Sequence, residues 1–163
     1  MRAGGGARWK AAPVTAGSGY SGTPLVRKLG LKPGMRVRLL DAPEGYWSLL
    51  GGSPGSLEVE VLAPDDPGEA DFTHLFAVEP AALAEGFERA RRTMAEDGMV
   101  WASWPKKSSD LPSEIGRAEV MAAGKTAGLV DVKVCAVDET WSGLRFVIPV
   151  AERGKPGAGR TSG

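Results

Sequence analysis

Residues 35–41 read MRVRLLD, and the fold class follows from this stretch together with what comes after it. Its branched and apolar residues predict a β-strand that ends in a turn. Residues 43–50 then predict a helix with Pro43 in its first turn, where proline's missing amide hydrogen costs nothing. Residues 57–62 (LEVEVL) alternate between apolar and charged side chains, which is typical of a half-buried strand near a sheet edge. Residues 63–70 are expected to form a loop.

A second strand–helix unit follows. Residues 71–78 (DFTHLFAV) predict a strand. Residues 79–95 predict a helix, because apolar residues recur there at helical spacing: Leu83, Phe87, Ala90 and Met94. Asp97 and Gly98 are expected to stop this helix before a further strand over residues 99–104.

The last part of the chain predicts a helix and a β-hairpin. The helix is expected within residues 110–129 from about Pro112, although three glycines weaken it: Gly116, Gly124 and Gly128. Residues 132–137 and 144–150 are rich in β-forming residues, and the turn formers of residues 138–143 lie between them. This pattern predicts an antiparallel pair of strands.

Together these elements predict an α/β fold. We expect a Rossmann-like, mostly parallel sheet with helices on both faces and a C-terminal antiparallel β-hairpin. Residues 20–152 form the single expected domain, which is long enough for its own hydrophobic core. Residues 1–19 and 153–163 are rich in small residues and carry few apolar side chains, so we expect them to be disordered.

Charge, cysteine content and hydropathy exclude several classes of protein. Twenty basic and twenty acidic residues give a formal net charge of zero, so no overall field draws the chain to nucleic acid or to an anionic membrane. Cys135 is the one cysteine, which excludes an intrachain disulfide and suits a reducing compartment. No apolar run approaches the roughly 18 residues of a membrane span, and residues 1–19 lack the apolar segment of a signal peptide. We expect a cytoplasmic location, with neither nucleic acid nor membrane as a partner.

Four sequence motifs resemble those of a known family. They are GYSGTPL (residues 19–25), KLGLKPGMRVRLLDAPEGY (28–46), SWPKK (103–107) and LVDVKVCAVDETWSGLR (129–145). In this order they resemble the bacterial family catalogued as domain of unknown function 3052, over about residues 19–150. This resemblance implies no activity.

A looser similarity links the chain to class I S-adenosylmethionine-dependent methyltransferases. It rests on residues 31–37 leading into a strand, on residues 71–76 as a central strand, on the acid–glycine turn before residues 99–104, and on the terminal hairpin. The similarity implies the strand order two, one, four, five, seven, six, with the usual third strand missing. It also implies S-adenosylmethionine as a possible cofactor of a truncated methyltransferase-like domain.

The turn after the first strand departs from that family. A Gly-rich turn lets backbone approach the cofactor closely, but residues 41–46 read DAPEGY. Pro43 removes an amide donor, and Glu44 places a carboxylate near the helix N-terminus, where a bound anion would lie. If the cofactor binds here, the residues expected to contact it are Asp41, Glu44, Gly45, Tyr46 and an acid after the next strand, Asp65 or Asp66. The alternative for these two acids is a solvated turn.

A second candidate site lies at the carboxyl ends of later strands, where ligands bind in open α/β sheets. Its residues come from two segments: Ser103, Trp104, Lys106 and Lys107 from the first, and Asp138, Glu139, Thr140 and Trp141 from the second. The adjacent lysines suit a phosphate or carboxylate, and the tryptophans suit a planar ligand. Alternatively, the lysines are solvated or paired with the nearby acids, and the tryptophans close the core.

His74 and Cys135 do not point to catalysis. A single histidine within an apolar strand is expected to be a satisfied core residue rather than a general base. With one histidine and one cysteine, no metal site is predicted. Cys135 is expected to be a small core residue. The sequence also lacks a P-loop, a GxSxG motif and an EF-hand loop.

Residues 19–25 fit either a lid over the sheet edge or, as we favour, the cap of a helix over residues 23–29, with Thr23 as N-cap and Pro24 as first residue. Three functions remain open. The leading hypothesis is a non-catalytic domain that binds a small anionic or nucleotide-like ligand or a protein partner. The others are a methyltransferase with an atypical cofactor turn, and an interaction protein, which a homo-oligomer through the terminal hairpin would favour.

Overall fold

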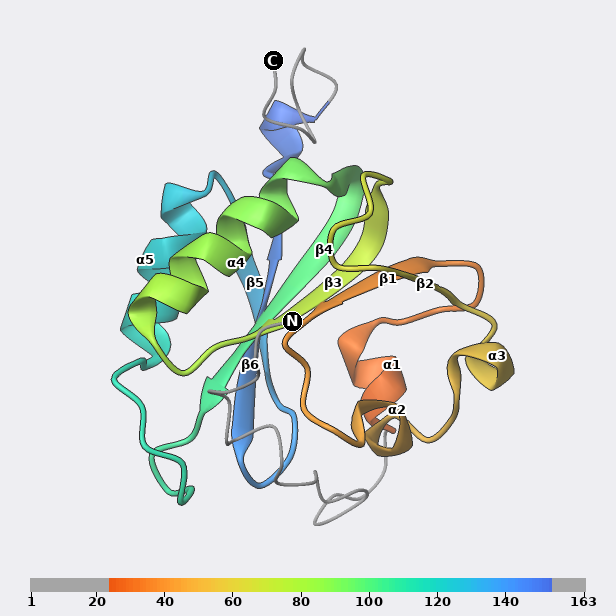
Figure 1. Ribbon diagram of the computed structural model, residues 1–163. Coiled ribbons are helices and arrows are strands. Elements are labelled where there is room, and N and C mark those ends of the chain that lie inside the picture. Colours follow the sequence, from red (N-terminus) through yellow and green to blue (C-terminus); the bar gives the residue numbers. More distant parts are fainter. Residues whose placement is uncertain (1–23, 154–163) are drawn as a thin grey trace.

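The computed structural model describes residues 24–153, which form a six-stranded sheet with helices on both faces (Figure 1). The strand order is β2-β1-β3-β4-β6-β5, and β6 alone runs against the others. The strands are β1 (Arg36–Leu40), β2 (Glu60–Leu62), β3 (Ala70–Phe76), β4 (Met94–Pro105), β5 (Val130–Ala136) and β6 (Trp141–Val147). This is the strand order that the methyltransferase resemblance implies. The predicted Rossmann-like α/β fold with an antiparallel C-terminal hairpin is therefore confirmed.

The helices divide between the two faces of the sheet. One face carries three short helices, α1 (Leu25–Leu29), α2 (Tyr46–Leu49) and α3 (Pro54–Leu57). The other face carries the two longer helices, α4 (Pro80–Arg92) and α5 (Arg117–Thr126), which lie side by side in Figure 1. A 3-10 turn, Val150–Glu152, follows β6.

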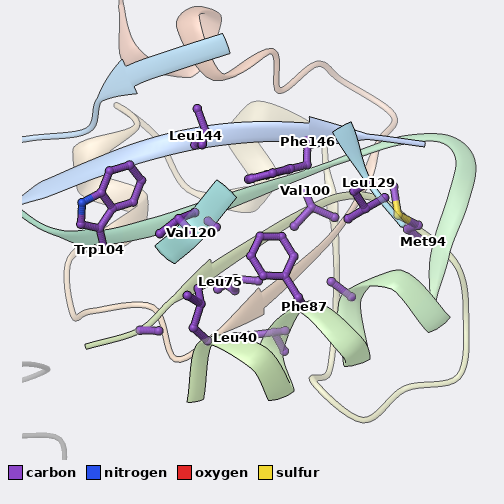
Figure 2. Packing of buried hydrophobic residues seen from close by; sticks show 14 of the residues in the cluster. Leu40, Leu75, Phe87, Met94, Val100, Trp104, Val120, Leu129, Leu144 and Phe146 are labelled. Carbon is purple, nitrogen blue, oxygen red and sulfur yellow. The ribbon is translucent and has the colours of Figure 1, made fainter. Parts of the chain in front are cut away.

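The core beneath α4 and α5 is built around two phenylalanines, as Figure 2 shows. The rings of Phe87 on α4 and Phe146 on β6 meet edge to face at 4.9 Å. Helix α5 lies directly on Phe146, because a Cβ atom built on Gly124 would fall 2.2 Å from a carbon of that ring. Gly124 lowers the helix propensity of α5, but because it has no side chain it also lets α5 approach the sheet.

Gly124→Ala is expected to lower the free energy of unfolding, because the methyl group overpacks the core at Phe146 at a cost of about 1–3 kcal/mol. Alanine gains roughly 1 kcal/mol over glycine within a helix, so the net loss is up to about 2 kcal/mol. The urea unfolding midpoint measures it. Gly86→Ala on α4 is the matched control, since its new Cβ would make an ordinary 3.4 Å contact with Leu75; it should be neutral or stabilising. Equal stability of the two variants would contradict the packing argument.

On the opposite face, Trp101 of β4 attaches α1 to the centre of the sheet. Its indole Nε1–H donates to the carbonyl oxygen of Leu29 at 2.8 Å, and the side chain is fully buried. Cys135 also lies in this cluster and is 8% exposed, as predicted for a small core residue. Burial raises the pKa of its thiol, so Cys135 is not an activated nucleophile.

A buried arginine holds the loop between β2 and β3 onto the sheet. Arg38 of β1 is 1% exposed, and its guanidinium donates to the backbone carbonyls of Asp66 (2.5 Å) and Gly68 (2.9 Å). Longer bonds, 3.4 Å each, reach the carbonyls of Ala63 and Thr93. Burial lowers the pKa of Arg38 below its ordinary value, yet an arginine remains charged in a protein. The loop predicted over residues 63–70 is thus present up to residue 69 and is fixed by one cation.

Two predicted elements in the first half differ from the structure. The helix expected over residues 43–50 is reduced to α2, because Gly45 adopts a left-handed backbone (φ 84°) and the helix begins only after it. The strand expected over residues 57–62 is reduced to β2. Its first part belongs to α3 instead, which Pro54 opens and Ser53 caps by accepting from the amide of Ser56 at 3.1 Å.

The prediction that Met94 lies on the preceding helix was wrong. Helix α4 ends at Arg92, and β4 begins at Met94, which is fully buried and pairs with Ala70. The next pair is Phe72 with Met99, so β4 bulges outward between them. A bulged strand buries Met94 as fully as a helix would. The spacing of apolar residues therefore could not tell the two structures apart at this position.

The elements of the C-terminal half are also shifted. Helix α5 is shorter than the predicted 110–129, since the Glu119 carboxylate accepts from the amide of Gly116 and fixes the helix start there. The first hairpin strand begins two residues and ends one residue earlier than predicted, and the second lies three residues earlier. Pro24 is the N-cap of α1 rather than its first residue. Thr23, residues 1–19, most of residues 19–25 and all but the first of residues 153–163 lie outside the described residues.

Candidate functional site

The strands β1, β3 and β4 end on one edge of the sheet, at Leu40, Phe76 and Pro105. The order of the sheet reverses between β1 and β3, because β2 lies on one side of β1 and all later strands lie on the other. Ligands of open α/β folds bind beyond this edge. Hollows lie along this edge within the described residues, after β4 and beside β1.

The larger hollow follows β4 and has a volume of about 690 Å³. The chain from the end of β4 to the first turn of α5 lines it: Pro105, Lys106, Lys107, Ser109, Asp110, Leu111, Pro112, Ser113, Glu114, Ile115, Gly116 and Glu119. A second hollow of about 530 Å³ shares Pro112, Ser113 and Glu114 with it and extends toward Val78 at the end of β3. We call the larger one the β4–α5 cavity. Lys106 and Lys107, which the sequence predicted as candidates, both line it.

Serine side chains give the wall of the β4–α5 cavity its shape. Ser109 Oγ donates to the carbonyl of Lys106 at 2.8 Å, and Ser113 Oγ donates to the carbonyl of Val78 at 2.8 Å. Ser113 Oγ also accepts from the amide of Ile115 at 3.0 Å. These hydroxyls stabilise the loop, and the serine- and proline-rich composition of residues 108–113 is the sequence signal that would have indicated it.

The hairpin tip lies next to the lysine pair, as predicted, but its residues have structural roles. The amide of Lys106 donates to the carbonyl of Thr140 at 2.8 Å. Asp138 Oδ1 accepts from the amides of Thr140 and Trp141, both at 2.8 Å, which closes the turn. Because this tight turn starts β6 at Trp141, the residue enters the sheet instead of the loop.

Neither candidate tryptophan is available to stack on a ligand. Trp141 is 2% exposed and meets Phe76 edge to face at 5.0 Å. Trp104 is 7% exposed and belongs to the core of the opposite face (Figure 2). The alternative reading, that both tryptophans close the core, is therefore confirmed.

Ser103 is likewise removed from the candidate ligand site, because it belongs to a buried hydrogen-bond chain. His74 Nε2 and Ser103 Oγ lie 2.7 Å apart, and His74 Nδ1 lies 2.8 Å from the Tyr46 hydroxyl. The three side chains are 0–3% exposed and join β3, β4 and α2. A neutral imidazole donates through one nitrogen and accepts through the other, so both hydroxyls satisfy it. The prediction of a satisfied core histidine is confirmed.

Burial also fixes the protonation of this chain. It lowers the pKa of His74 to about 3 and raises the pKa of the Tyr46 phenol well above its usual value. At neutral pH the imidazole is neutral and the phenol is protonated. These three buried side chains therefore tie β3, β4 and α2 together.

The residues that were expected to contact a cofactor at the turn after β1 do not form one site in the structure. Asp41 and Gly45 both adopt left-handed backbones, with φ of 63° and 84°, while Glu44 is exposed. Tyr46 is 3% exposed. Asp65 is exposed on the loop after β2, and Asp66 Oδ1 accepts from the amide of Gly68 at 2.7 Å. Asp41 lines a hollow beside β1.

That smaller hollow, of about 350 Å³, lies between the end of β1 and α4. Leu40, Asp41, Leu75, Phe76, Ala82, Glu85, Gly86 and Arg89 line it. Its charged groups are the carboxylates of Asp41 and Glu85 and the guanidinium of Arg89. The guanidinium also donates to the carbonyl of Pro64 at 3.1 Å. Its place at the point where the strand order reverses makes it the second candidate site.

Residues 24–153 contain no cluster of three or more His, Cys, Asp or Glu side chains that could hold a metal ion. Within the same residues, no helix has the length and apolar character needed to cross a membrane.

Residues 65–150 match the model of a family described as a protein of unknown function, DUF3052, and this match covers more than half of the chain. The chain belongs to this family. The predicted family is thereby confirmed, and the motifs at residues 103–107 and 129–145 lie within the matched range. No curated protein matches the DUF3052 chain in sequence.

Solved structures place the DUF3052 chain in the methyltransferase fold. A SAM-dependent methyltransferase from Aquifex aeolicus has a TM-score of 0.52 at 16% identity, over 76% of this chain and 88% of its own. CalO1, a calicheamicin biosynthesis methyltransferase with SAH bound, has 0.53 at 14%, over 76% and 52%. A possible exported protein from Bordetella parapertussis has 0.54 at 13%, over 77% and 66%. The DUF3052 chain thus spans under two thirds of two of these proteins, and the likeness shows the fold alone.

Proposed function

We propose that this domain binds a small anionic or nucleotide-like ligand in the β4–α5 cavity. The observation that carries the proposal is the pair Lys106 and Lys107, which lines a hollow of about 690 Å³ beyond the carboxyl end of β4. Among residues 24–153, neither lysine has a carboxylate within 4.0 Å. Two ammonium groups without an ion-pair partner at a concave site suit a phosphate or carboxylate group.

The other charged side chains of the cavity limit the charge that a bound anion can carry. Three carboxylates line it as well, from Asp110, Glu114 and Glu119, and one oxygen of Glu119 is used by the amide of Gly116. These carboxylates repel a polyanion, because like charges in a partly enclosed site are costly. We therefore expect a ligand with one anionic group, such as a nucleoside monophosphate, to bind more tightly than a triphosphate.

Replacing both Lys106 and Lys107 with methionine is expected to weaken adenosine monophosphate binding by at least about tenfold, since charge-assisted bonds contribute about 1.5–3 kcal/mol each. Isothermal titration calorimetry with adenosine monophosphate, adenosine triphosphate and inorganic phosphate measures this. Lys125→Met, at an exposed position near the end of α5, is the matched control and should bind as the wild type does.

A thermal shift screen with the same probes gives a second readout, because a ligand at 100 times its dissociation constant adds about 2.7 kcal/mol of stability. The proposal is overturned if none of the probes stabilises the wild type. It is equally overturned if the double variant binds adenosine monophosphate as tightly as Lys125→Met does.

An S-adenosylmethionine-dependent methyltransferase is the second candidate function. It is favoured by the fold and by the hollow of about 350 Å³ that Asp41 lines where the strand order reverses. Against it stand Pro43, which has no amide hydrogen, and the four-residue α2, whose Tyr46 is bonded to His74. Stabilisation by S-adenosylmethionine that Asp41→Asn abolishes, and that the double lysine variant retains, would place this function first.

A further inference from the structure

The hollow between the end of β3 and residues 112–114 differs in chemistry from the β4–α5 cavity beside it, and we call it the β3 hollow. Its volume is about 530 Å³, and seven residues line it: Val78, Glu79, Pro80, Ala81, Pro112, Ser113 and Glu114. Most of these side chains are apolar. The charged groups among them are two carboxylates, whereas the neighbouring cavity carries the lysine pair.

Both carboxylates of the β3 hollow are open to a ligand. Glu79 is the N-cap of α4, yet its side chain makes no capping bond. Within residues 24–153, the carboxylates of Glu79 and Glu114 accept no hydrogen bond and form no ion pair. The hydroxyl of Ser113, in contrast, already donates to the carbonyl of Val78. Because an ionised carboxylate only accepts hydrogen bonds, the group that binds in this hollow must donate them.

We infer that the β3 hollow holds the guanine base of a nucleoside monophosphate, whose phosphate lies at Lys106 and Lys107. The N–H groups of the base donate to the carboxylates of the hollow. This inference rests on the proposed function of the β4–α5 cavity. The two hollows share residues 112–114, so they are adjacent and one ligand can extend from the lysines into the β3 hollow.

The apolar side chains of the β3 hollow favour a base over a simple ammonium group. Pro80, Ala81 and Pro112 present hydrocarbon surface, and a flat ring covers such surface while its polar edge reaches the carboxylates. Ligand sites commonly combine apolar walls with a few polar groups that fix the orientation of the ligand. An ammonium group would satisfy the carboxylates but leave the apolar walls in water.

The hydrogen-bonding edges of the bases favour guanine. Its ring N1–H and its 2-amino group lie side by side and donate in parallel, which matches the two oxygens of one carboxylate, as the fork of an arginine does. Adenine and cytosine place an acceptor ring nitrogen beside the amino group, and uracil places a carbonyl oxygen on each side of its N–H. Each of these edges sets an acceptor against a carboxylate oxygen.

Isothermal titration calorimetry of the full chain with guanosine, inosine and adenosine monophosphate tests the inference. Inosine monophosphate differs from guanosine monophosphate only by the missing 2-amino group. Guanosine monophosphate is expected to bind about tenfold more tightly than inosine monophosphate, because a hydrogen bond to a charged acceptor is lost without that group. Adenosine monophosphate should bind no more tightly than inosine monophosphate.

The double variant Glu79→Gln with Glu114→Gln removes both carboxylates of the β3 hollow. Loss of their negative charge strengthens the binding of every phosphate alike, so the ratio of the guanosine and inosine dissociation constants is the informative quantity. This ratio should fall to within about twofold of one. Asp110→Asn is the matched control, since Asp110 lines the β4–α5 cavity but not the β3 hollow. It removes the same charge and should leave the ratio as in the wild type.

The possible failures are distinguishable. If the wild type binds guanosine and inosine monophosphate equally well, the inference is overturned and the proposed function stands. The same holds if the double glutamine variant keeps the preference for guanosine monophosphate. If the wild type binds none of the three monophosphates, both the inference and the proposed function are overturned.

Discussion

Arg38→Ala is expected to lower the free energy of unfolding by about 2–3 kcal/mol, because it removes a buried guanidinium and the charge-assisted bonds that it donates to partly buried carbonyl oxygens. The guanidinium donates to the carbonyl oxygens of Asp66 and Gly68 at 2.5 and 2.9 Å, and Arg38 is 1% exposed. Chemical denaturation monitored by tryptophan fluorescence gives the free energy directly.

Arg38→Lys separates charge from geometry. Lysine keeps the cation but has a single ammonium group, which cannot span carbonyls on both sides of the loop, so we expect it to recover less than half of the loss. Arg27→Ala, at an exposed position on α1, controls for the removal of an arginine and should change stability by less than about 0.5 kcal/mol. If Arg38→Ala is no more harmful than Arg27→Ala, the loop is held by other contacts.

The stability of the domain is expected to fall as the pH drops from about 6.5 to about 3, because of His74. Its folded pKa of about 3 lies below the ordinary value of 6.5, so within this window the unfolded chain binds a proton that the folded chain does not. Stability therefore rises with pH across the window, by about 1.4 kcal/mol per pH unit for this one group. Urea unfolding at several pH values, compared with His74→Gln, isolates the contribution: the stability difference between the two proteins should shrink as the pH falls.

Nuclear magnetic resonance supplies an independent readout, since His74 is the only histidine of the chain. Its imidazole carbon-bound protons should show the neutral form from pH 7 down to about pH 4. A midpoint near 6.5 in the folded protein would show that the ring is solvated and would refute the sealed Tyr46–His74–Ser103 chain.

The strand–helix alternation of the sequence was sufficient to predict the sheet. Parallel strands need crossover connections, and the apolar stretches around β1, β3 and β4 are separated by helical segments or turns that can supply them. The ends of helices and strands were less predictable where a helix and a strand would both bury the same residue. Met94 illustrates this, because the helix and the bulged strand place it equally well in the core.

The candidate site was predicted only in part for a related reason. Lys106 and Lys107 belong to a loop and lie where the sequence placed them, next to the hairpin tip. Their predicted neighbours Ser103 and Trp141 are buried in the sheet. The sequence shows that these residues lie near the ends of strands, but it does not show which face of the sheet each side chain takes or where the hairpin strand begins. The bond between Tyr46 and His74 joins residues 28 positions apart, and no local pattern indicates such a contact.

The shortness of β2 has a consequence for growth into filaments. The strand that ends the sheet opposite β5 spans only Glu60–Leu62, and Glu60 and Val61 are exposed on it. Three residues offer too little backbone to template a neighbour, whereas the seven of β5 offer a full strand. Within the described residues, the sheet therefore has one edge long enough to pair with another strand and one that is too short, so pairing from edge to edge does not extend through successive molecules.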